Sequence, residues 1–225
     1  MRMKRLAHGY TNETGLDGDV VVKRYVGRNA DARFAAETCA LQGLRDALPV
    51  ASVLASGARE VRLSRMPGIH GKELIDSKLA STAMVAMARM LQKVHACDVP
   101  LDVPVAGGSL VHGDYGPQNL LFSASADRVL TILDWEWAHY GEAIEDLASV
   151  EWVVRTHHPT QLERLLAFYD AYGERPVWRE RQEAMVRRCR EFREKDPVDR
   201  ASVGRVAFWD ERIELVGNWR KIPGE

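Results

Sequence analysis

The chain has 225 residues, 46% of them hydrophobic and 28% charged, with a formal net charge of −1. This composition is typical of a globular protein with enough apolar side chains for a core, and the length suits one domain or two lobes around a cleft. A net charge near zero gives no overall field that would attract nucleic acid or an anionic membrane. We therefore expect neither as a partner, although a net charge does not exclude a local charged patch.

The apolar segments and the cysteines indicate the compartment. No run of residues approaches the ~20 apolar positions that span a bilayer, and the basic start of the chain is not followed by the apolar core of a secretory signal. The cysteines are odd in number and far apart, at Cys39, Cys97 and Cys189. This suits a reducing compartment and argues against a disulfide framework or a zinc module. We expect a cytoplasmic protein, and nothing in the sequence indicates its oligomeric state.

Strand signals dominate the first part of the chain. Residues 20–25 form a β-branched run after turn residues and predict a strand. Residues 31–48 predict a helix that ends before Pro49. Residues 52–58 and 60–66 predict a strand pair that a Pro-Gly turn closes.

Helices dominate the rest, with one hairpin between them. Apolar residues within 77–97 recur at the spacing of an amphipathic helix, namely Met84, Met87, Ala88, Leu91 and Val94. Residues 120–133 predict a β-hairpin, and the pattern beyond residue 142 is almost wholly helical. This order predicts an α+β protein with a small β-rich N-terminal lobe, residues 1–67, and a helical C-terminal lobe, residues 68–225.

The strongest motif is H-G-D-Y-G-P-Q-N at residues 112–119, which fits the H-x-D-x-x-x-x-N spacing of kinase catalytic loops. In such a loop the aspartate, here Asp114, takes the proton of the acceptor hydroxyl. The asparagine, here Asn119, offers a neutral oxygen to magnesium. The alternative is a Gly/Pro turn in which both residues are turn formers.

A second acidic motif follows the predicted hairpin. In I-L-D-W-E, Asp134 closes an apolar strand twenty positions after Asp114, and the hairpin would return it to the same cleft. A strand that ends in aspartate is common by itself. Together with Asn119 it predicts a site for a metal ion and a nucleotide.

Lys23 and Glu37 are candidates for a buried ion pair. Lys23 lies in V-V-K, which is similar to the V-A-I-K lysine that holds nucleotide phosphates in kinases. Glu37 falls within the apolar stripe of the predicted helix, where an unpaired carboxylate is costly. A lysine from the neighbouring strand would offset this cost, whereas the alternative makes both residues surface charges.

Together these segments resemble the aminoglycoside phosphotransferase family, including its choline- and homoserine-kinase-like relatives. The resemblance covers about residues 9–148 and is most specific in the H-G-D-Y-G-P-Q-N and L-D-W-E segments. It implies a protein-kinase-like two-lobed fold and a small-molecule kinase, which transfers the γ-phosphoryl group of a nucleotide to a hydroxyl. The implied cofactors are ATP, with GTP left open, and Mg²⁺.

The resemblance also assigns roles to single residues. It makes Asp114 the catalytic base and Asn119 and Asp134 the magnesium ligands. Lys23 would contact the nucleotide phosphates, with Glu37 as its partner. These five residues form the expected core of the site.

Other segments match the family more loosely. In R-L-S-R-M-P-G, which looks like the family's hinge, the backbone of Ser64 and Met66 would hold the adenine edge. Asp146 in D-L-A looks like the aspartate that braces the catalytic loop. A Gly-rich G-x-G-x-x-G is absent, so the phosphate-covering loop is expected in H-G-Y-T-N-E-T, with Thr11 and Asn12 among its donors.

Two features are typical of small-molecule kinases rather than protein kinases. Gly113 stands where an arginine commonly precedes the catalytic aspartate and binds a phosphorylated activation loop. Only eleven residues separate Asp134 from Asp146, which is too short for such a loop. We therefore expect no control by activation-loop phosphorylation.

The acceptor is expected to be a small hydroxylated molecule, aminoglycoside-like, an amino alcohol or a sugar. The region from residue 135 onward carries acidic and aromatic side chains that suit a cation, and Glu136 is its one candidate substrate residue. The alternative makes the tryptophans core and the acids a solvated helix end. The other side chains concerned are Glu142, Glu145, Glu151, Trp135, Trp137 and Trp152. Residues 178–195, rich in Arg and Glu, predict a salt-bridged surface helix.

Two other functions remain open. A kinase-shaped nucleotide-binding regulator that performs no transfer fits the missing Gly-rich loop. A metal-dependent hydrolase would be built from His112, Asp114, Asp134 and Glu136, and it would have no use for Lys23 or Glu37.

Overall fold

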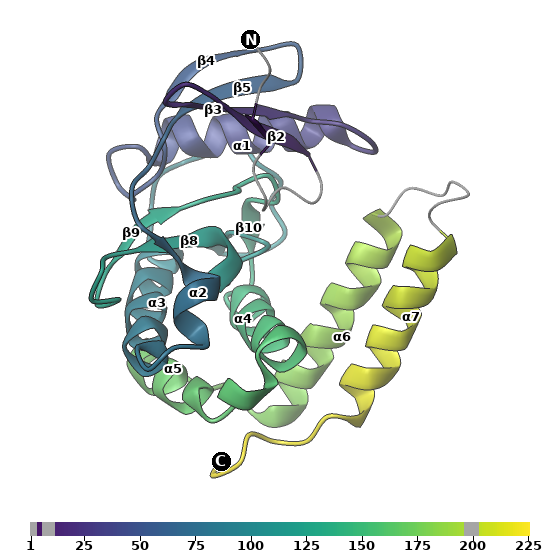
Figure 1. Ribbon diagram of the computed structural model, residues 1–225. Helices are drawn as coiled ribbons and strands as arrows, with labels where there is room; N and C mark the ends of the chain where they lie inside the picture. The colour runs from purple at the N-terminus through teal and green to yellow at the C-terminus, as the bar shows by residue number, and fades with distance from the viewer. Residues whose placement is uncertain (1–3, 6–11, 196–202) are drawn as a thin grey trace.

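A computed structural model describes residues 4–5, 12–195 and 203–225 of the chain. An antiparallel sheet lies at one end of the molecule, and helices make up the other end (Figure 1). This arrangement confirms the predicted α+β class, with strands early in the chain and helices late. The sheet has the strand order β1 (Lys4–Arg5), β2 (Glu13–Asp17), β3 (Val20–Arg24), β5 (Glu60–Ser64), β4 (Val53–Gly57).

One helix covers a face of this sheet (Figure 1). α1, Ala30–Leu44, buries Leu41 and Leu44 in the main core that also includes Val61 of β5. The helix stops four residues before the predicted end and is followed by a turn, in which the N–H groups of Ala47 and Leu48 both bond to Leu44 O, at 3.0 and 2.9 Å. This tightened turn precedes Pro49, whose ring disfavours a helical conformation in the residue before it.

A small second sheet joins the two parts of the molecule. Its outer strand β6, Ile69–His70, pairs with β8, Leu120–Phe122, which pairs in turn with β9, Val129–Ile132. The β8–β9 hairpin was predicted. Strand β6 and the short α2, Gly71–Ile75, were not, because two- to five-residue elements carry no readable period.

The remaining elements build the helical part. They are α3 (Ala80–His95), β7 (Ser109–Val111), the 3₁₀ helices η1 (Pro117–Asn119) and η2 (Pro159–Gln161), β10 (His139–Gly141), α4 (Ile144–His157), α5 (Arg164–Tyr172), α6 (Trp178–Lys195) and α7 (Val203–Asn218). β7 and β10 pair with each other. Across the described ranges, every helix is too short or too polar to serve as a membrane span.

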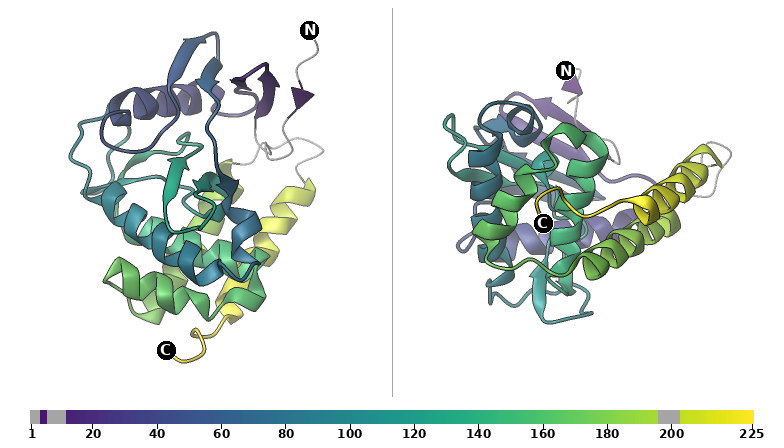
Figure 2. Two further views of the ribbon diagram at one scale, coloured as in Figure 1. Left: turned by 60° about the vertical axis from the view of Figure 1, so that its left-hand side comes forward. Right: turned by 90° about the horizontal axis from the view of Figure 1, so that it is seen from below.

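The helical part has a second apolar core of its own. α6 and α7 project from the body as a pair (Figure 2); α6 packs on α4, and α7 packs on α6. Trp152 of α4, Met185 and Cys189 of α6 and Val216 of α7 are buried together there. α6 is thereby fixed against the element that follows the D-W-E segment.

Candidate active site

Lys23 lies at the centre of a buried charge cluster between the sheet and the helical part. It projects from β3, and its Nζ donates to Glu37 Oε2 at 2.5 Å and to Asp134 Oδ1. Glu136 Oε2 is 3.3 Å from the same nitrogen. The Lys23–Glu37 pair predicted from the sequence is therefore present, and Lys23 also links two segments that are far apart along the chain.

Glu37 is buried on the core-facing side of α1, as the apolar stripe indicated. Only 2% of its surface is exposed, and Oε2 also accepts a hydrogen bond from the Tyr25 hydroxyl. A buried carboxylate without donors would cost several kcal/mol. The lysine and the tyrosine supply those donors, and their hydrogen bonds hold α1 against β3.

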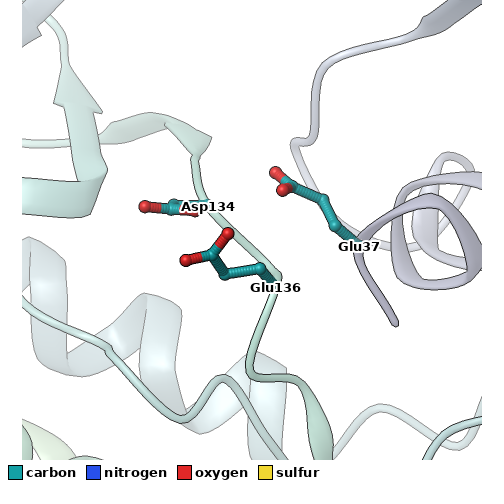
Figure 3. Close-up of side chains that lie close together, drawn as sticks. All are labelled: Glu37, Asp134 and Glu136. Carbon is teal, nitrogen blue, oxygen red and sulfur yellow. The ribbon is translucent and has the colours of Figure 1, made fainter. Parts of the chain in front are cut away.

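Three carboxylates converge around this lysine (Figure 3). Glu37 comes from α1, whereas Asp134 and Glu136 come from the segment after β9, and oxygens of all three lie within 4.8 Å of one another. Glu136 also accepts hydrogen bonds from Arg33 Nη1, at 3.2 and 3.3 Å. Two cations therefore face three carboxylates, which leaves the cluster one negative charge in excess.

The pKa values in the cluster follow from this imbalance. Burial lowers the pKa of Lys23, but the carboxylates, Asp134 foremost, outweigh burial and raise it well above its ordinary value. Partial burial disfavours the charged form of Asp134 as well, yet Lys23 lowers the pKa of this carboxyl. Burial and the charge of Asp134 raise the pKa of Glu136 to about 7. Glu136 is thus the carboxyl on which the excess charge is most easily neutralised by a proton.

Asp134 has a left-handed backbone that turns its side chain toward the cleft. Its φ is 65°, a conformation that Asp, Asn and Gly adopt more readily than other residues. The side chain is 38% exposed, against 8% or less for Lys23, Glu37 and Glu136. Asp134 is therefore the member of the cluster that a ligand can reach from solvent.

The catalytic-loop segment and the D-W-E segment are joined at the base of the hairpin. Leu133 N donates to Asn119 O at 2.8 Å. Asn119 lies just before β8 and Asp134 just after β9, so both lie at the same end of this antiparallel pair. The Asn119 Nδ2 group donates to Asp114 O and Oδ2, at 2.8 and 3.0 Å. The structure thus brings together the three residues for which the sequence predicted a common site.

Asp146 holds the H-G-D-Y-G-P-Q-N loop in place through hydrogen bonds to its backbone. It is fully buried, and its carboxylate accepts the backbone N–H groups of His112 at 2.8 Å and Gly113 at 3.0 Å, with His95 Nε2 at 3.3 Å. Burial opposes its ionisation, but the hydrogen bonds from His95 and from the backbone N–H of His112 lower the pKa of Asp146. This is the bracing contact expected of the D-L-A aspartate.

His112 is a packing residue rather than a metal ligand. Its Nε2 donates to Leu133 O at 2.8 Å, and its Nδ1 accepts the N–H of Asp114 at 3.2 Å. Both ring nitrogens are therefore occupied. The ring fixes the loop relative to the end of β9 and has no nitrogen left for an ion.

Gly113 is required by both backbone angle and space. Its φ is 80°, and a Cβ at this position would lie 2.5 Å from Trp137 O. An L side chain would meet backbone there, which a rotamer change cannot relieve. The absence of the arginine common in protein kinases thus has a local steric cause.

A pocket of about 440 Å³ opens beside the loop. Gly113, Trp137 and Glu136 line one side of it, and α6 forms another side. The remaining lining includes acidic and basic side chains, namely Glu142, Glu145, Glu191, His139, Arg33, Arg187 and Arg188. The volume suits a small molecule, and the mixed charge differs from the purely acidic, aromatic rim expected from the sequence.

Three of the residues that the sequence placed at the acceptor pocket lie outside it. Glu151 is fully buried and bonds to Arg155, Tyr169 and Arg181, while Trp135 and Trp152 are core residues. These three do not line the pocket, because Trp135 packs in the main core, Trp152 of α4 packs in the second core, and Glu151 of α4 is held by its buried hydrogen bonds. The alternative of core tryptophans is confirmed for Trp135 and Trp152.

The remaining candidates for nucleotide contacts have mixed outcomes. Ser64 N donates to Ser52 O at 2.9 Å, so this N–H is already used within the sheet, and Met66 lies in the extended segment after β5. Asn12 donates to Glu136 Oε2 at 2.5 Å and accepts from Arg33 at 2.9 Å. Thr11 lies outside the described residues. Asn12 is therefore placed at the cluster, with both ends of its amide engaged.

Two residues of the site were missed from the sequence. Arg33 lies one helical turn before Glu37 on α1 and bonds to Glu136; this i, i+4 spacing on a buried face was a usable signal. Arg188 of α6 donates from Nη2 to Asp114 Oδ1 at 2.5 Å. Nothing in the charged 178–195 segment distinguished it from its neighbours, and the expectation of a purely surface helix is wrong at this position.

The donor set fits a magnesium ion. Asn119 directs its amide nitrogen to Asp114, so the amide oxygen is the group left for an ion. Asp134 contributes a carboxylate that opens to the cleft. Both are hard oxygen ligands of the kind that Mg²⁺ prefers, and such sites keep several waters or phosphate oxygens as further ligands.

Comparison with known proteins agrees with this geometry. Residues 106–184 match the model of the phosphotransferase enzyme family, and this range contains the catalytic loop and the D-W-E segment. No curated protein sequence matches the chain.

Solved structures show the likeness over nearly the whole chain. Wild-type aminoglycoside 2'-phosphotransferase-IIIa, solved with GDP, gives a TM-score of 0.73 at 14% identity, covering 97% of this chain and 94% of that one. A mutant of aminoglycoside phosphotransferase APH(4)-Ia, solved with ADP and hygromycin B, gives 0.68 at 14% identity, covering 96% and 92%. The gentamicin complex of APH(2")-IIa gives 0.69 at 11% identity, covering 97% and 92%. At such identities the likeness shows the fold.

The predicted resemblance is thus confirmed: residues 106–184 match the phosphotransferase enzyme family, and the chain as a whole has the kinase-like two-lobed fold of the aminoglycoside phosphotransferases.

Proposed function

We propose that this protein is a small-molecule kinase that moves the γ-phosphoryl group of ATP to a hydroxyl of its acceptor. The observation that carries the proposal is the meeting of Lys23, from β3, with Asp134, from the end of β9, beside the loop that holds Asp114 and Asn119. Phosphoryl transfer needs positioning and charge neutralisation more than covalent chemistry. These residues supply a cation, two oxygen ligands and a base at one place.

Each residue has a role in this proposal. Lys23, held by Glu37, binds the nucleotide phosphates, and Asn119 and Asp134 hold the magnesium ion, which would neutralise phosphate charge when bound. Asp114 accepts the proton of the acceptor hydroxyl. The acceptor oxygen forms its bond to the γ-phosphorus while the bond to the β-phosphate oxygen breaks.

The nucleotide would bind between the lobes, which we propose to divide as residues 1–67 and 68–225. Because the N–H of Ser64 is used within the sheet, Met66 is the better donor for an adenine edge. Asn12 and Thr11 remain proposed contacts of the phosphate-covering loop. Asn12 would have to exchange its bond to Glu136 for one to phosphate.

The pocket beside Gly113 is the proposed acceptor site. Its volume of about 440 Å³ and its mixed acidic and basic lining suit a small hydroxylated molecule such as an aminoglycoside, an amino alcohol or a sugar. Glu136 lies at its inner edge, shared with the charge cluster. Among solved relatives of the same fold, one was solved with gentamicin and another with hygromycin B.

The two rival functions make different demands on the site. A metal-dependent hydrolase would require His112 as a ligand, and both nitrogens of this ring are occupied. A non-transferring regulator would need the nucleotide site but not an ordered base. Asp114 is held by donors on both carboxylate oxygens, which favours the enzyme.

A direct test measures nucleotide binding and transfer separately. With Mg²⁺ present, ATP should raise the thermal midpoint, and turnover should appear with one of a panel of hydroxylated amines. Asp134→Asn, which suits the left-handed backbone, should remove the magnesium-dependent part of both effects. Binding without turnover across the panel would favour the regulator, and no binding at all would refute the proposal.

A further inference from the structure

Arg188 of helix α6 contacts Asp114, the proposed base. Arg188 Nη2 donates to Asp114 Oδ1 at 2.5 Å, and Nη1 donates to Gly113 O at 3.1 Å. A planar guanidinium that contacts both a carboxylate and the neighbouring carbonyl fixes direction as well as distance. The contact therefore restrains both the side chain of Asp114 and the backbone before it.

The guanidinium is itself held between rings. Its carbon lies 5.6 Å from the centroid of Trp152 and 4.6 Å from that of Phe192. Only 11% of the side chain is exposed. The neighbouring Cys189 belongs to the core that joins α4, α6 and α7. Arg188 is thus presented to Asp114 by packed elements, with little freedom to move away.

Stability alone does not account for an arginine here. Its Nε is buried and has no hydrogen-bond partner within the described part of the chain. A buried donor left unsatisfied costs about 1–3 kcal/mol. The two aromatic rings could pack around a methionine too, so the charge and the fork geometry need another explanation.

The two oxygens of Asp114 are held differently. Oδ1 accepts from Arg188 and, at 3.3 Å, from Gln118 Nε2. Oδ2 accepts from Asn119 Nδ2, the residue proposed to hold magnesium. Oδ1 thus accepts two hydrogen bonds and Oδ2 only one, so Oδ2 is the oxygen with a lone pair left to receive a proton.

We propose that Arg188 of α6 is a positioning residue for the catalytic base: it fixes Asp114 through Oδ1 so that Oδ2 faces the acceptor hydroxyl. This inference rests on the proposed kinase function. It makes the α6–α7 pair part of the active site. The proton leaves the hydroxyl for Oδ2 as the oxygen–phosphorus bond forms, and Arg188 exchanges no proton because its guanidinium stays charged.

The opposite possibility is a latch, in which Arg188 must leave Asp114 before the acceptor binds. A latch would lower activity in the native protein, so its removal would raise turnover. Positioning predicts the reverse. The two ideas therefore differ in the sign of one measurement.

The test compares Arg188→Met, Arg188→Lys and Arg190→Met. Met keeps the length and the ring contacts but loses the fork. Lys keeps a charge but cannot contact Asp114 Oδ1 and Gly113 O together. Arg190 is exposed, two positions along α6 and about 200° around the helix, and serves as the matched control. Thermal unfolding of each variant checks that the fold is retained.

Arg188→Met should lower kcat by roughly 10- to 100-fold, the effect of a misplaced reactive group, with the KM for ATP unchanged. Arg188→Lys should recover part of the loss, and Arg190→Met should match the native protein. An unchanged or increased kcat in Arg188→Met would overturn the proposal. So would an equal loss in Arg188→Lys and Arg188→Met.

A second readout does not depend on the acceptor. The carboxyl carbon of Asp114, in protein with ¹³C-labelled aspartate, gives an NMR signal that Asp114→Asn identifies by its absence. Arg188→Met should shift this signal, whereas Arg190→Met should leave it in place. An unmoved signal in Arg188→Met overturns the contact. A shifted signal in a protein that shows no transfer with any acceptor would instead refute the kinase proposal and leave the contact standing.

Discussion

The cleft has two sides that are built in different ways. The proposed nucleotide side, Lys23, Glu37 and Asp134, is a compact charge cluster whose members lie at strand ends and on one helix face. The proposed acceptor side, Arg188 and the α6 surface around it, is assembled by the packing of α6 against α4. In the proposed function, the residues of the first side must suit phosphates and magnesium, whereas those of the second must suit the acceptor.

This difference explains what the sequence could reveal. Phosphate chemistry demands the same few residue types at short spacings, so Asp114, Asn119 and Asp134 were recognisable as motifs. The acceptor wall has no such constraint. Arg188 is one of many charged residues in its helix, and only its placement by the α4–α6 core distinguishes it.

The largest expected effect is on the boundary between the two sides. Asp114→Asn removes the proposed base but keeps the shape of the side chain, and kcat should fall roughly 10²–10⁴-fold. Stabilisation by MgATP should persist, because Lys23 and Asp134 are untouched. Asp46→Asn, at a side chain 88% exposed, is the control. Full turnover in Asp114→Asn would show that the base has been misassigned.

The second-largest expected effect is on stability, from a change at the proposed nucleotide side. Lys23→Met leaves three carboxylates with Arg33 as their one remaining cation within the described cluster. Breaking a buried ion pair costs about 3–5 kcal/mol, so denaturant unfolding should show a loss of this order. The double variant Lys23→Met, Glu37→Gln should recover part of it. If the single and double variants are equally unstable, the Lys23–Glu37 pair is not what holds α1 on β3.

The bracing aspartate gives a smaller, pH-dependent effect. The pKa of Asp146 is lowered in the folded protein. Its ionised form therefore contributes stability above about pH 4, the ordinary value for aspartate, and this contribution is lost as the pH falls through the folded pKa. Asp146→Asn should be less stable than the native protein near neutral pH, by about 1–3 kcal/mol for the disturbed buried hydrogen bonds.

The measurement for Asp146 is the difference in unfolding free energy between native protein and Asp146→Asn, followed from pH 7 down to acid. That difference should narrow below about pH 4. A gap that stays constant across this range would show that the charge of Asp146 contributes nothing and that only its shape matters. His95, its ring partner, should be kept intact throughout, since its replacement would change two contacts at once.

The smallest effect is expected on the outer edge of the acceptor side. Arg193 and Asp210 join α6 to α7 at 2.7 Å, but their side chains are 42% and 53% exposed. Such surface pairs contribute about 0–1 kcal/mol. Arg193→Ala should leave both stability and kcat nearly unchanged. A clear loss of kcat would mean that the α6–α7 pairing controls Arg188 more tightly than the buried core alone does.

Other parts of the fold were predictable to different degrees, for physical reasons. The β8–β9 hairpin and Glu37 on the buried stripe of α1 follow from periodicity and burial cost, and both were found. β6 and α2 were too short to carry a period. Glu151 was misplaced because an acidic residue on a late helix gives no sign that Arg181 and Tyr169 will bury it.

The left-handed backbone at Asp134 has a consequence for tolerated variation. With φ at 65°, this position admits Asn and Gly with little strain, whatever the chemistry demands of the side chain. A library scored for abundance in cells should therefore retain those two substitutions and deplete the β-branched ones. The same library scored for phosphoryl transfer should lose them all. Substitutions at position 134 would then distinguish the requirements of folding from those of catalysis.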